Sequence, residues 1–135
     1  MASTKYSDYD IDFEKNSFTG DVSVKKESNA IRQSVRNIIM TRKGEKPFNR
    51  NFGVGVHQLL FENVAGGLAV ATLRSDIQEA LNSFEPRVVL TDVIFDETLI
   101  DSNQLSITVE YKILNESDIA ASPVDRITIA LTKVR

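Results

Sequence analysis

The sequence contains no cysteine, no tryptophan and a single histidine, and these absences exclude several classes of function. Without cysteine, the chain has neither a disulfide framework nor a thiolate metal site. The one histidine, His57, has no cysteine to pair with, and no serine lies in the context of a nucleophile elbow. A lone histidine and scattered carboxylates show no metal-ligand spacing. We therefore expect no catalytic residue, no metal and no cofactor.

Long apolar runs are also missing from the sequence. No run approaches the roughly 20 residues that span a bilayer, and Met1 to Asp10 contain no apolar core of a secretory signal. The composition, 41% hydrophobic and 26% charged, is that of an ordinary globular domain. We expect one domain that is made in the cytosol and does not act at a membrane.

The net charge of −3 conceals a segregation along the chain. Residues 1–24 carry two basic and five acidic side chains, residues 25–50 carry eight and two, and residues 51–135 carry six and twelve. A basic middle segment is compatible with nucleic acid or with an acidic protein. Its single aromatic, Phe48, and the sequence pI near 5.2 argue against nucleic acid. An acidic protein partner and plain solvated lysines both fit better.

The first 20 residues are polar and acidic with scattered aromatics, which predicts an extended N-terminal arm that ends in a turn at Thr19–Asp21. The arm is either a disordered tail or a segment whose aromatics pack on the body or on a neighbour. Residues 21–135 are predicted to form a single α+β domain, beginning with a short strand over 21–24.

Hydrophobic spacing predicts a first helix from Ser28 to about Arg42. Ser28 can cap its start, and Gly44 can supply a left-handed C-cap. Arg32 and Arg36 lie on the outer face of this helix. That basic face is either simply solvated or a docking face for an acidic partner helix.

A rigid charged corner follows the second long helix. Apolar residues at helical spacing predict this helix over 68–84, and Pro86 ends it because the residue before a proline avoids the helical region. From Val88 onward, β-branched residues indicate a strand. Glu85 and Arg87 thus carry opposite charges at a fixed corner, where a guanidinium can make a bidentate contact with a carboxylate.

The remaining pattern predicts a short helix over 56–62 and three strands after the corner. The first strand, 87–95, is apolar on both faces and is expected to be covered on both sides. Strands 104–114 and 125–134 alternate apolar and polar residues and are expected to be half-buried. The fold class is therefore α+β, with N-terminal helices packed on one face of a small, three- to four-stranded, mainly antiparallel sheet. Its edge can accept a strand from another chain.

One enzymatic alternative needs only two carboxylates, as in a peptidoglycan-degrading glycosidase. Glu62 and Glu85 have the most apolar surroundings. Against this alternative, no tryptophan is present to stack on a sugar, and Arg87 favours the ionised form of Glu85.

Several fragments, taken in order, resemble one family. They are Thr41-Arg-Lys-Gly-Glu-Lys-Pro-Phe48, Asn51-Phe-Gly53, Leu59-Leu-Phe-Glu62 and Phe84-Glu-Pro-Arg-Val88. Their order and spacing resemble the baseplate wedge proteins of contractile-tailed bacteriophages, a family shared with a baseplate component of type VI secretion systems. The resemblance covers about residues 21–134. Where members often carry arginine after Gly-Glu, this chain has Lys46, which loses forked hydrogen bonding there.

The resemblance implies a non-enzymatic virion protein of the inner baseplate, one copy per wedge and six in the assembled ring. Its implied partners are the larger wedge proteins, bound through a helical core bundle, and the tail sheath protein, whose first strand pairs with the C-terminal sheet. It implies no small-molecule substrate and no nucleic acid. The expected location is the virion tail baseplate, after assembly in the host cytoplasm. A type VI secretion or related contractile injection system is the alternative.

The site residues that follow form two groups. The wedge-binding group comprises Glu85, Pro86, Arg87, Arg32 and Arg36. The sheath-pairing group comprises Ile107, Val109, Tyr111, Ile127, Ile129 and Leu131. We expect the isolated chain to be a monomer.

Overall fold

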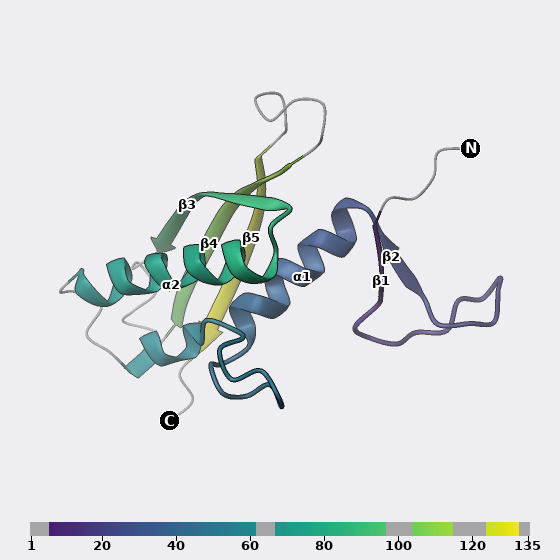
Figure 1. Cartoon of the computed structure of the whole chain (residues 1–135), viewed down its shortest axis with the longest axis horizontal. Helices are drawn as coiled ribbons and strands as arrows, with labels where there is room; N and C mark the ends of the chain where they lie inside the picture. The colour runs from purple at the N-terminus through teal and green to yellow at the C-terminus, as the bar shows by residue number, and fades with distance from the viewer. Residues whose placement is uncertain (1–5, 62–66, 97–103, 115–123, 133–135) are drawn as a thin grey trace.

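The computed structural model describes residues 6–61, 67–96, 104–114 and 124–132, which fold as two helices beside a three-stranded sheet (Figure 1). The predicted α+β class is therefore confirmed. The elements are β1 (Ser7–Tyr9), β2 (Val24–Lys26), α1 (Ser28–Met40), the 3₁₀ helix η1 (Val56–Phe61), α2 (Leu68–Phe84), β3 (Val88–Asp96), β4 (Gln104–Ile113) and β5 (Val124–Thr132).

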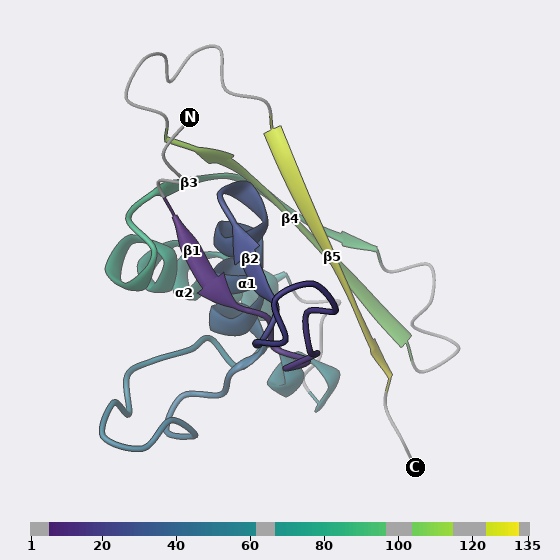
Figure 2. The ribbon, with the colours of Figure 1, turned by 90° about the vertical axis from the view of Figure 1, so that its right-hand side faces the viewer.

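The main sheet is antiparallel with the order β3-β4-β5, so β4 is central. Both long helices lie on the same face of this sheet (Figure 2). Along β4 and β5 every second residue points to that face and is buried, as the alternation in the sequence predicted. The opposite face of the sheet carries the polar residues of the same strands.

Strand β3 differs from the prediction, because only one of its faces is covered. Val88 and Val93 are buried, whereas Val89 and Ile94 are 45% and 46% exposed. The register with β4 shifts between Leu90 and Asp92, which marks a β-bulge. A bulge adds one residue and reverses the alternation. Even-numbered residues before the bulge and odd-numbered residues after it therefore point to the same buried face. In the sequence, these apolar residues look like those of a strand that is covered on both sides.

Helix α1 is shorter than predicted and has different caps. It ends at Met40, because Thr41 is already extended. Ser28 is the first helical residue, and the N-cap is Glu27, whose φ is 52° and whose side chain makes no capping hydrogen bond. Gly44 has the predicted left-handed φ of 89° but lies in the following loop.

Helix α2 has the predicted bounds and closes the core. Its buried residues Leu73, Ile77, Ala80 and Leu81 join α1 and the inner face of the sheet in one hydrophobic cluster. Tyr111 is the largest fully buried side chain in that cluster. None of the described helices is long and apolar enough to cross a membrane.

The N-terminal arm is a β-hairpin that extends away from the main sheet (Figure 1). Ser7 pairs with Lys26 and Tyr9 with Val24, so the hairpin crosses the predicted boundary at residue 20. The predicted strand over 21–24 overlaps β2 at Val24 alone, because β2 begins there and runs to Lys26. The buried Gln33 of α1 holds the arm through hydrogen bonds to the backbone of Tyr9 and Ile11.

Candidate docking surfaces

The corner after α2 is fixed by backbone hydrogen bonds on both sides. The N–H of Glu85 donates to the carbonyl of Leu81 at 2.8 Å and completes the last helical turn. The N–H of Val88 donates to the carbonyl of Glu85 at 3.2 Å and closes the turn around the proline. The N–H of Leu114, at the end of β4, donates to the carbonyl of Arg87 at 2.7 Å. The corner therefore cannot move without breaking helix or sheet contacts.

The side chains at this corner form a forked ion pair. The carboxylate of Glu85 is 2% exposed and accepts from Nε of Arg87 and, at 2.6 Å, from Nη2. Burial alone would raise the pKa of Glu85, but hydrogen bonds from Arg87 and Ser34 outweigh it and lower the pKa. The same hydrogen bond raises the pKa of Arg87. The pair is therefore fully ionised at neutral pH.

Arg87 also faces outward. The fork uses two of the five guanidinium N–H groups, and 35% of the side chain is exposed. The guanidinium carbon lies 4.8 Å from the ring centroid of Tyr6, on the N-terminal arm. This cation–π contact joins the arginine to the N-terminal arm.

The structure does not bring Arg32 and Arg36 to this corner. Ser34 hydrogen-bonds Glu85, whereas Arg32 forks onto Asp125 of β5, with 3.2 Å between Nε and Oδ2. The hydroxyl of Tyr111 donates to the same oxygen at 3.1 Å. The hydrogen bond with Asp125 raises the pKa of Arg32. Arg32 thus ties α1 to β5 on a different side of the helix.

An open groove of about 630 Å³ lies between α1, the N-terminal arm and β5. Its lining includes four cations, Lys25, Arg32, Arg36 and Arg126, and one carboxylate, Asp12. Three of the cations are in ion pairs, but Arg36 is in none among the residues that the structure describes. Arg36 therefore places beside the edge of the sheet a cation that no ion pair among the described residues neutralises.

The predicted sheath-pairing residues divide between a central and an edge strand. Ile107, Val109 and Tyr111 belong to β4, whose backbone is paired with β3 and β5. Ile127, Ile129 and Leu131 belong to β5, which among the described residues is paired on one side, with β4. All six side chains point into the core. Within the described part of the chain, β5 therefore offers free backbone groups at its outer side, whereas β4 is paired on both sides.

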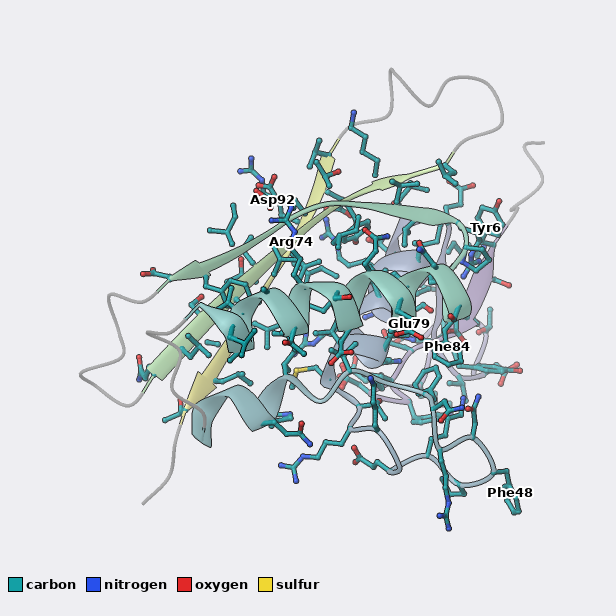
Figure 3. The ribbon with its side chains drawn as sticks, turned by 60° about the vertical axis from the view of Figure 1, so that its left-hand side comes forward. Tyr6, Phe48, Arg74, Glu79, Phe84 and Asp92 are labelled. Carbon is teal, nitrogen blue, oxygen red and sulfur yellow. The ribbon has the colours of Figure 1, made fainter. Side chains whose placement is uncertain are left out.

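The two edges of the sheet are unequal. The ladder between β4 and β5 runs for nine residue pairs without a register shift. The β3 edge carries the bulge, and Arg74 reaches from α2 to Asp92 with 2.9 Å between Nη2 and Oδ1 (Figure 3). Bulges and charges protect an edge from strand addition, so β5 is the more receptive edge.

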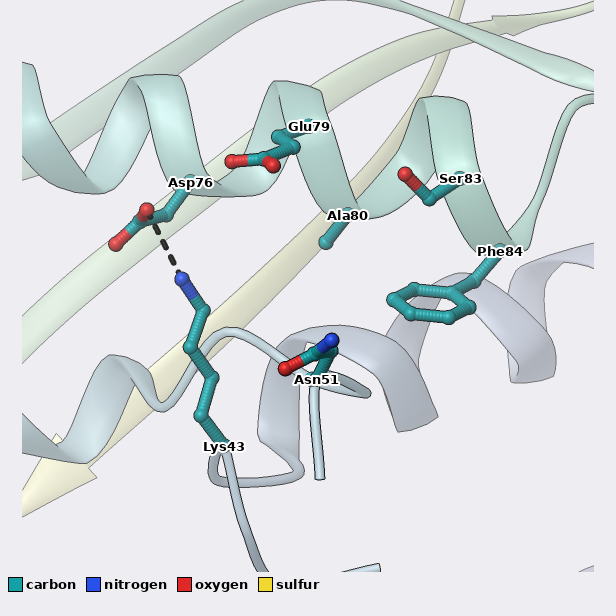
Figure 4. A pocket seen from close by; sticks show the side chains of 8 residues that line it. Lys43, Asn51, Asp76, Glu79, Ala80, Ser83 and Phe84 are labelled. Carbon is teal, nitrogen blue, oxygen red and sulfur yellow. Dashed lines mark hydrogen bonds and ion pairs between the residues drawn. The ribbon is translucent and has the colours of Figure 1, made fainter. Parts of the chain in front are cut away.

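Of the two carboxylates considered for a glycosidase, the structure describes Glu85 alone. Glu62 lies outside the described residues, and Glu85 is buried and ionised, so it cannot donate a proton. A different polar cleft of about 420 Å³, between α2 and the loop after α1, is lined by Asp76, Glu79 and Phe84 (Figure 4). Lys43 crosses it to Asp76 at 3.1 Å. Sequence reasoning missed this cleft because its two sides are about 30 residues apart.

Comparison with known proteins assigns the chain to a family. The family described as "Baseplate wedge protein gp25" matches residues 25–118. The protein of that name from Enterobacteria phage T4 is 31% identical over 115 residues, which cover 84% of this chain and 83% of the phage protein. The chain belongs to this baseplate wedge family. The matched region contains the Glu85–Arg87 corner, and β5 lies beyond it.

Two solved structures share the fold of this wedge-family chain. A candidate tail lysozyme from Geobacter sulfurreducens has a TM-score of 0.61 and 23% identity, covering 78% of this chain and 89% of that one. A chain of the six-fold symmetrised anti-feeding prophage baseplate has a TM-score of 0.60 and 24% identity, covering 91% of this chain and 83% of that one.

Proposed function

We propose that this baseplate wedge protein is a non-enzymatic scaffold that docks in the wedge through its charged corner and starts the tail sheath at the edge of β5. The observation that carries the proposal is the Glu85–Arg87 pair, ionised and locked at a corner whose backbone is held on both sides. Family membership supports the place of the protein in a baseplate.

The corner suits docking because little conformational freedom remains to be lost there. Glu85 and Tyr6 already fix the guanidinium of Arg87, and Ser34 holds the carboxylate of Glu85. Its unused N–H groups can fork onto a carboxylate of a partner helix without reorganising the side chain. A preorganised arginine is a common hot spot in protein interfaces.

The edge of β5 suits strand addition because its free backbone groups lie beside the groove that contains Arg36. An added strand would gain main-chain hydrogen bonds along a regular ladder. Because Arg36 has no ion-pair partner among the described residues and lies in that groove, we assign Arg36 to the strand-accepting surface rather than to the wedge surface. Arg32 has a structural role in holding β5 against α1.

We further propose a monomer in isolation and six copies in the assembled virion baseplate, after assembly in the host cytoplasm. The six-fold symmetry of the anti-feeding prophage baseplate, which holds a chain of the same fold, supports this number. A contractile injection machine is the alternative setting for the same two surfaces. The ionised state of Glu85 supports a role without glycoside hydrolysis.

The wedge contact is tested by changing the corner without leaving a buried charge. Arg87→Ala alone would leave the buried carboxylate of Glu85 without its partner, which costs about 3–5 kcal/mol of unfolding free energy for a buried pair. We therefore choose the double variant Glu85→Gln with Arg87→Leu, which removes both charges. We expect it to fold, as judged by thermal unfolding, and to lose co-purification with the wedge proteins.

A matched control is Arg74→Ala with Asp92→Ala, which removes an exposed ion pair elsewhere on the same helix–sheet unit. This control is expected to assemble normally. Normal wedge assembly by the folded corner variant would refute the docking role of the corner.

A further inference from the structure

The loop between α1 and η1 has a rigid base. The N–H groups of Val54 and Gly55 both donate to the carbonyl of Thr41, at 3.0 and 3.1 Å. Gly53 lies so close to this carbonyl that a Cβ atom there would be 2.3 Å from the oxygen. The two ends of the loop are therefore clamped together, and residues 42–52, here called the basic loop, project from this base.

The basic loop is also braced along its length. The N–H of Gly44 donates to the carbonyl of Arg50 at 2.8 Å and joins its two sides. The ring of Phe52 packs against Phe84 of α2, with 4.9 Å between centroids. The ammonium of Lys46 lies 4.1 Å from the centroid of Phe52 on another side. The loop is thus attached to the body and has a defined shape.

The tip of this loop presents Phe48 to solvent. Its side chain is fully exposed and points away from the body (Figure 3). Its φ of 65° lies in the left-handed region, which is unfavourable for a residue with a bulky side chain. Both the exposed ring and the backbone angle are unfavourable for the isolated chain. A strained residue held in place by a rigid frame is typical of a functional contact.

The basic loop that carries Phe48 also carries four cations. Arg42, Lys43, Lys46 and Arg50 are opposed by one carboxylate, Glu45, which accepts from the backbone N–H of Arg42. Within the described part of the chain, Arg42 and Arg50 form no ion pair. The loop is therefore positively charged on a chain whose net charge is −3.

We propose that the basic loop is a third docking surface, on which Phe48 enters an apolar socket in an acidic face of another baseplate protein. An aromatic anchor that is buried in a pocket, with a rim that excludes water, is a usual form of interface hot spot. An anionic membrane fits less well, since one ring and one short loop on an acidic chain give too little area and charge for stable binding. The proposal is independent of the Glu85–Arg87 corner.

The test uses the full-length chain and assembled wedge proteins from the same tail, with affinity measured by biolayer interferometry. Phe48→Asn removes the ring, and asparagine tolerates the left-handed region, so the variant is expected to fold at least as stably. We expect its affinity for the wedge to fall at least tenfold. Arg50→Glu is expected to weaken binding and reduce its dependence on salt.

Phe18→Asn is the matched control, because Phe18 is equally exposed but lies on the separate N-terminal hairpin. It is expected to bind as the unmodified chain does. Unchanged wedge affinity in Phe48→Asn would overturn the proposal. Two further results would also overturn it. If the unmodified chain self-associates and Phe48→Asn does not, the partner of Phe48 is a second copy of this chain. If the unmodified chain binds phosphatidylserine vesicles and Phe48→Asn does not, the partner is a lipid surface.

Discussion

At the scale of single residues, Tyr111 joins the core to the polar surface of α1. Its ring is fully buried, and its hydroxyl donates to Asp125, which also holds Arg32. Burial, together with the nearby carboxylate, raises the pKa of Tyr111 well above its ordinary value of 10. Ionisation of this phenol therefore opposes the folded state.

This shift predicts a loss of stability at alkaline pH. Because the folded pKa of Tyr111 is raised, its contribution is fully present below the unfolded pKa of about 10 and is lost as pH rises above that value. Urea unfolding at pH 7, 9 and 10.5 should show a falling midpoint for the unmodified chain. Tyr111→Phe should lose about 1 kcal/mol of unfolding free energy at pH 7, because one hydrogen bond is missing. The urea midpoint of this variant should fall less steeply with pH. Parallel pH profiles for the two chains would contradict this.

The charged residues show how far a sequence can place a site. The corner of Glu85 and Arg87 was predictable, because a proline fixes two residues that are neighbours in the chain. Arg32 and Arg36 were grouped with the corner on charge alone. The structure turns them toward β5, since the partner of Arg32 is 93 residues away. A pairing over that distance depends on how α1 is rotated against the sheet, which no local pattern records.

At the scale of elements, the conformation of the loop after α1 depends more on Gly53 than on Gly44. Gly44 and Gly53 both have left-handed backbones, with φ of 89° and 98°. Gly44 has open space where a side chain would begin, but at Gly53 a Cβ would meet the carbonyl oxygen of Thr41. The two positions therefore share the backbone strain and differ in the steric clash.

Alanine at these two positions should separate strain from clash. Gly44→Ala is expected to lose about 1–2 kcal/mol of unfolding free energy, the usual cost of a left-handed residue with a side chain. Gly53→Ala is expected to lose ~3 kcal/mol or more, because the clashing atom is backbone and cannot rotate away. Denaturant unfolding measures both values, and equal losses would show that the base of the loop can relax.

Most helices and strands followed from periodicity, and the exceptions have local causes. Helix α2 matched its predicted bounds because its apolar spacing and the proline after it agree. The exposed face of β3 was missed because a bulge reverses the alternation, and the extra residue, Thr91, looks ordinary in the sequence. The cap of α1 was missed because Glu27 adopts a positive φ, although it is neither glycine nor asparagine.

At the scale of the whole molecule, we propose three docking surfaces for different neighbours: the corner, the edge of β5 and the basic loop. The edge of β5 can be tested without any substitution. In an antiparallel edge strand, every second amide is paired and the others face outward. Free protein should therefore show alternating fast and slow amide hydrogen exchange along β5, and slow exchange throughout the middle of β4.

Binding of the sheath subunit should slow the fast amides of β5 and leave those of β4 unchanged. The double variant Glu85→Gln with Arg87→Leu should show the same protection, because the corner lies apart from this edge. Hydrogen exchange with mass spectrometry or NMR detection measures both effects. Fast exchange that persists along β5 in the sheath complex would rule out strand addition there.

The unequal edges of the sheet have a further consequence. A subunit whose sheet accepted strands at both edges could pair edge to edge with further copies of itself and form fibres. In this sheet the β5 edge is regular, whereas a bulge and an ion pair interrupt the β3 edge, which favours strand addition at β5 alone. Under the proposed strand addition at β5, such a subunit would form only the first layer of a stack and would give the growing tail a direction from its base.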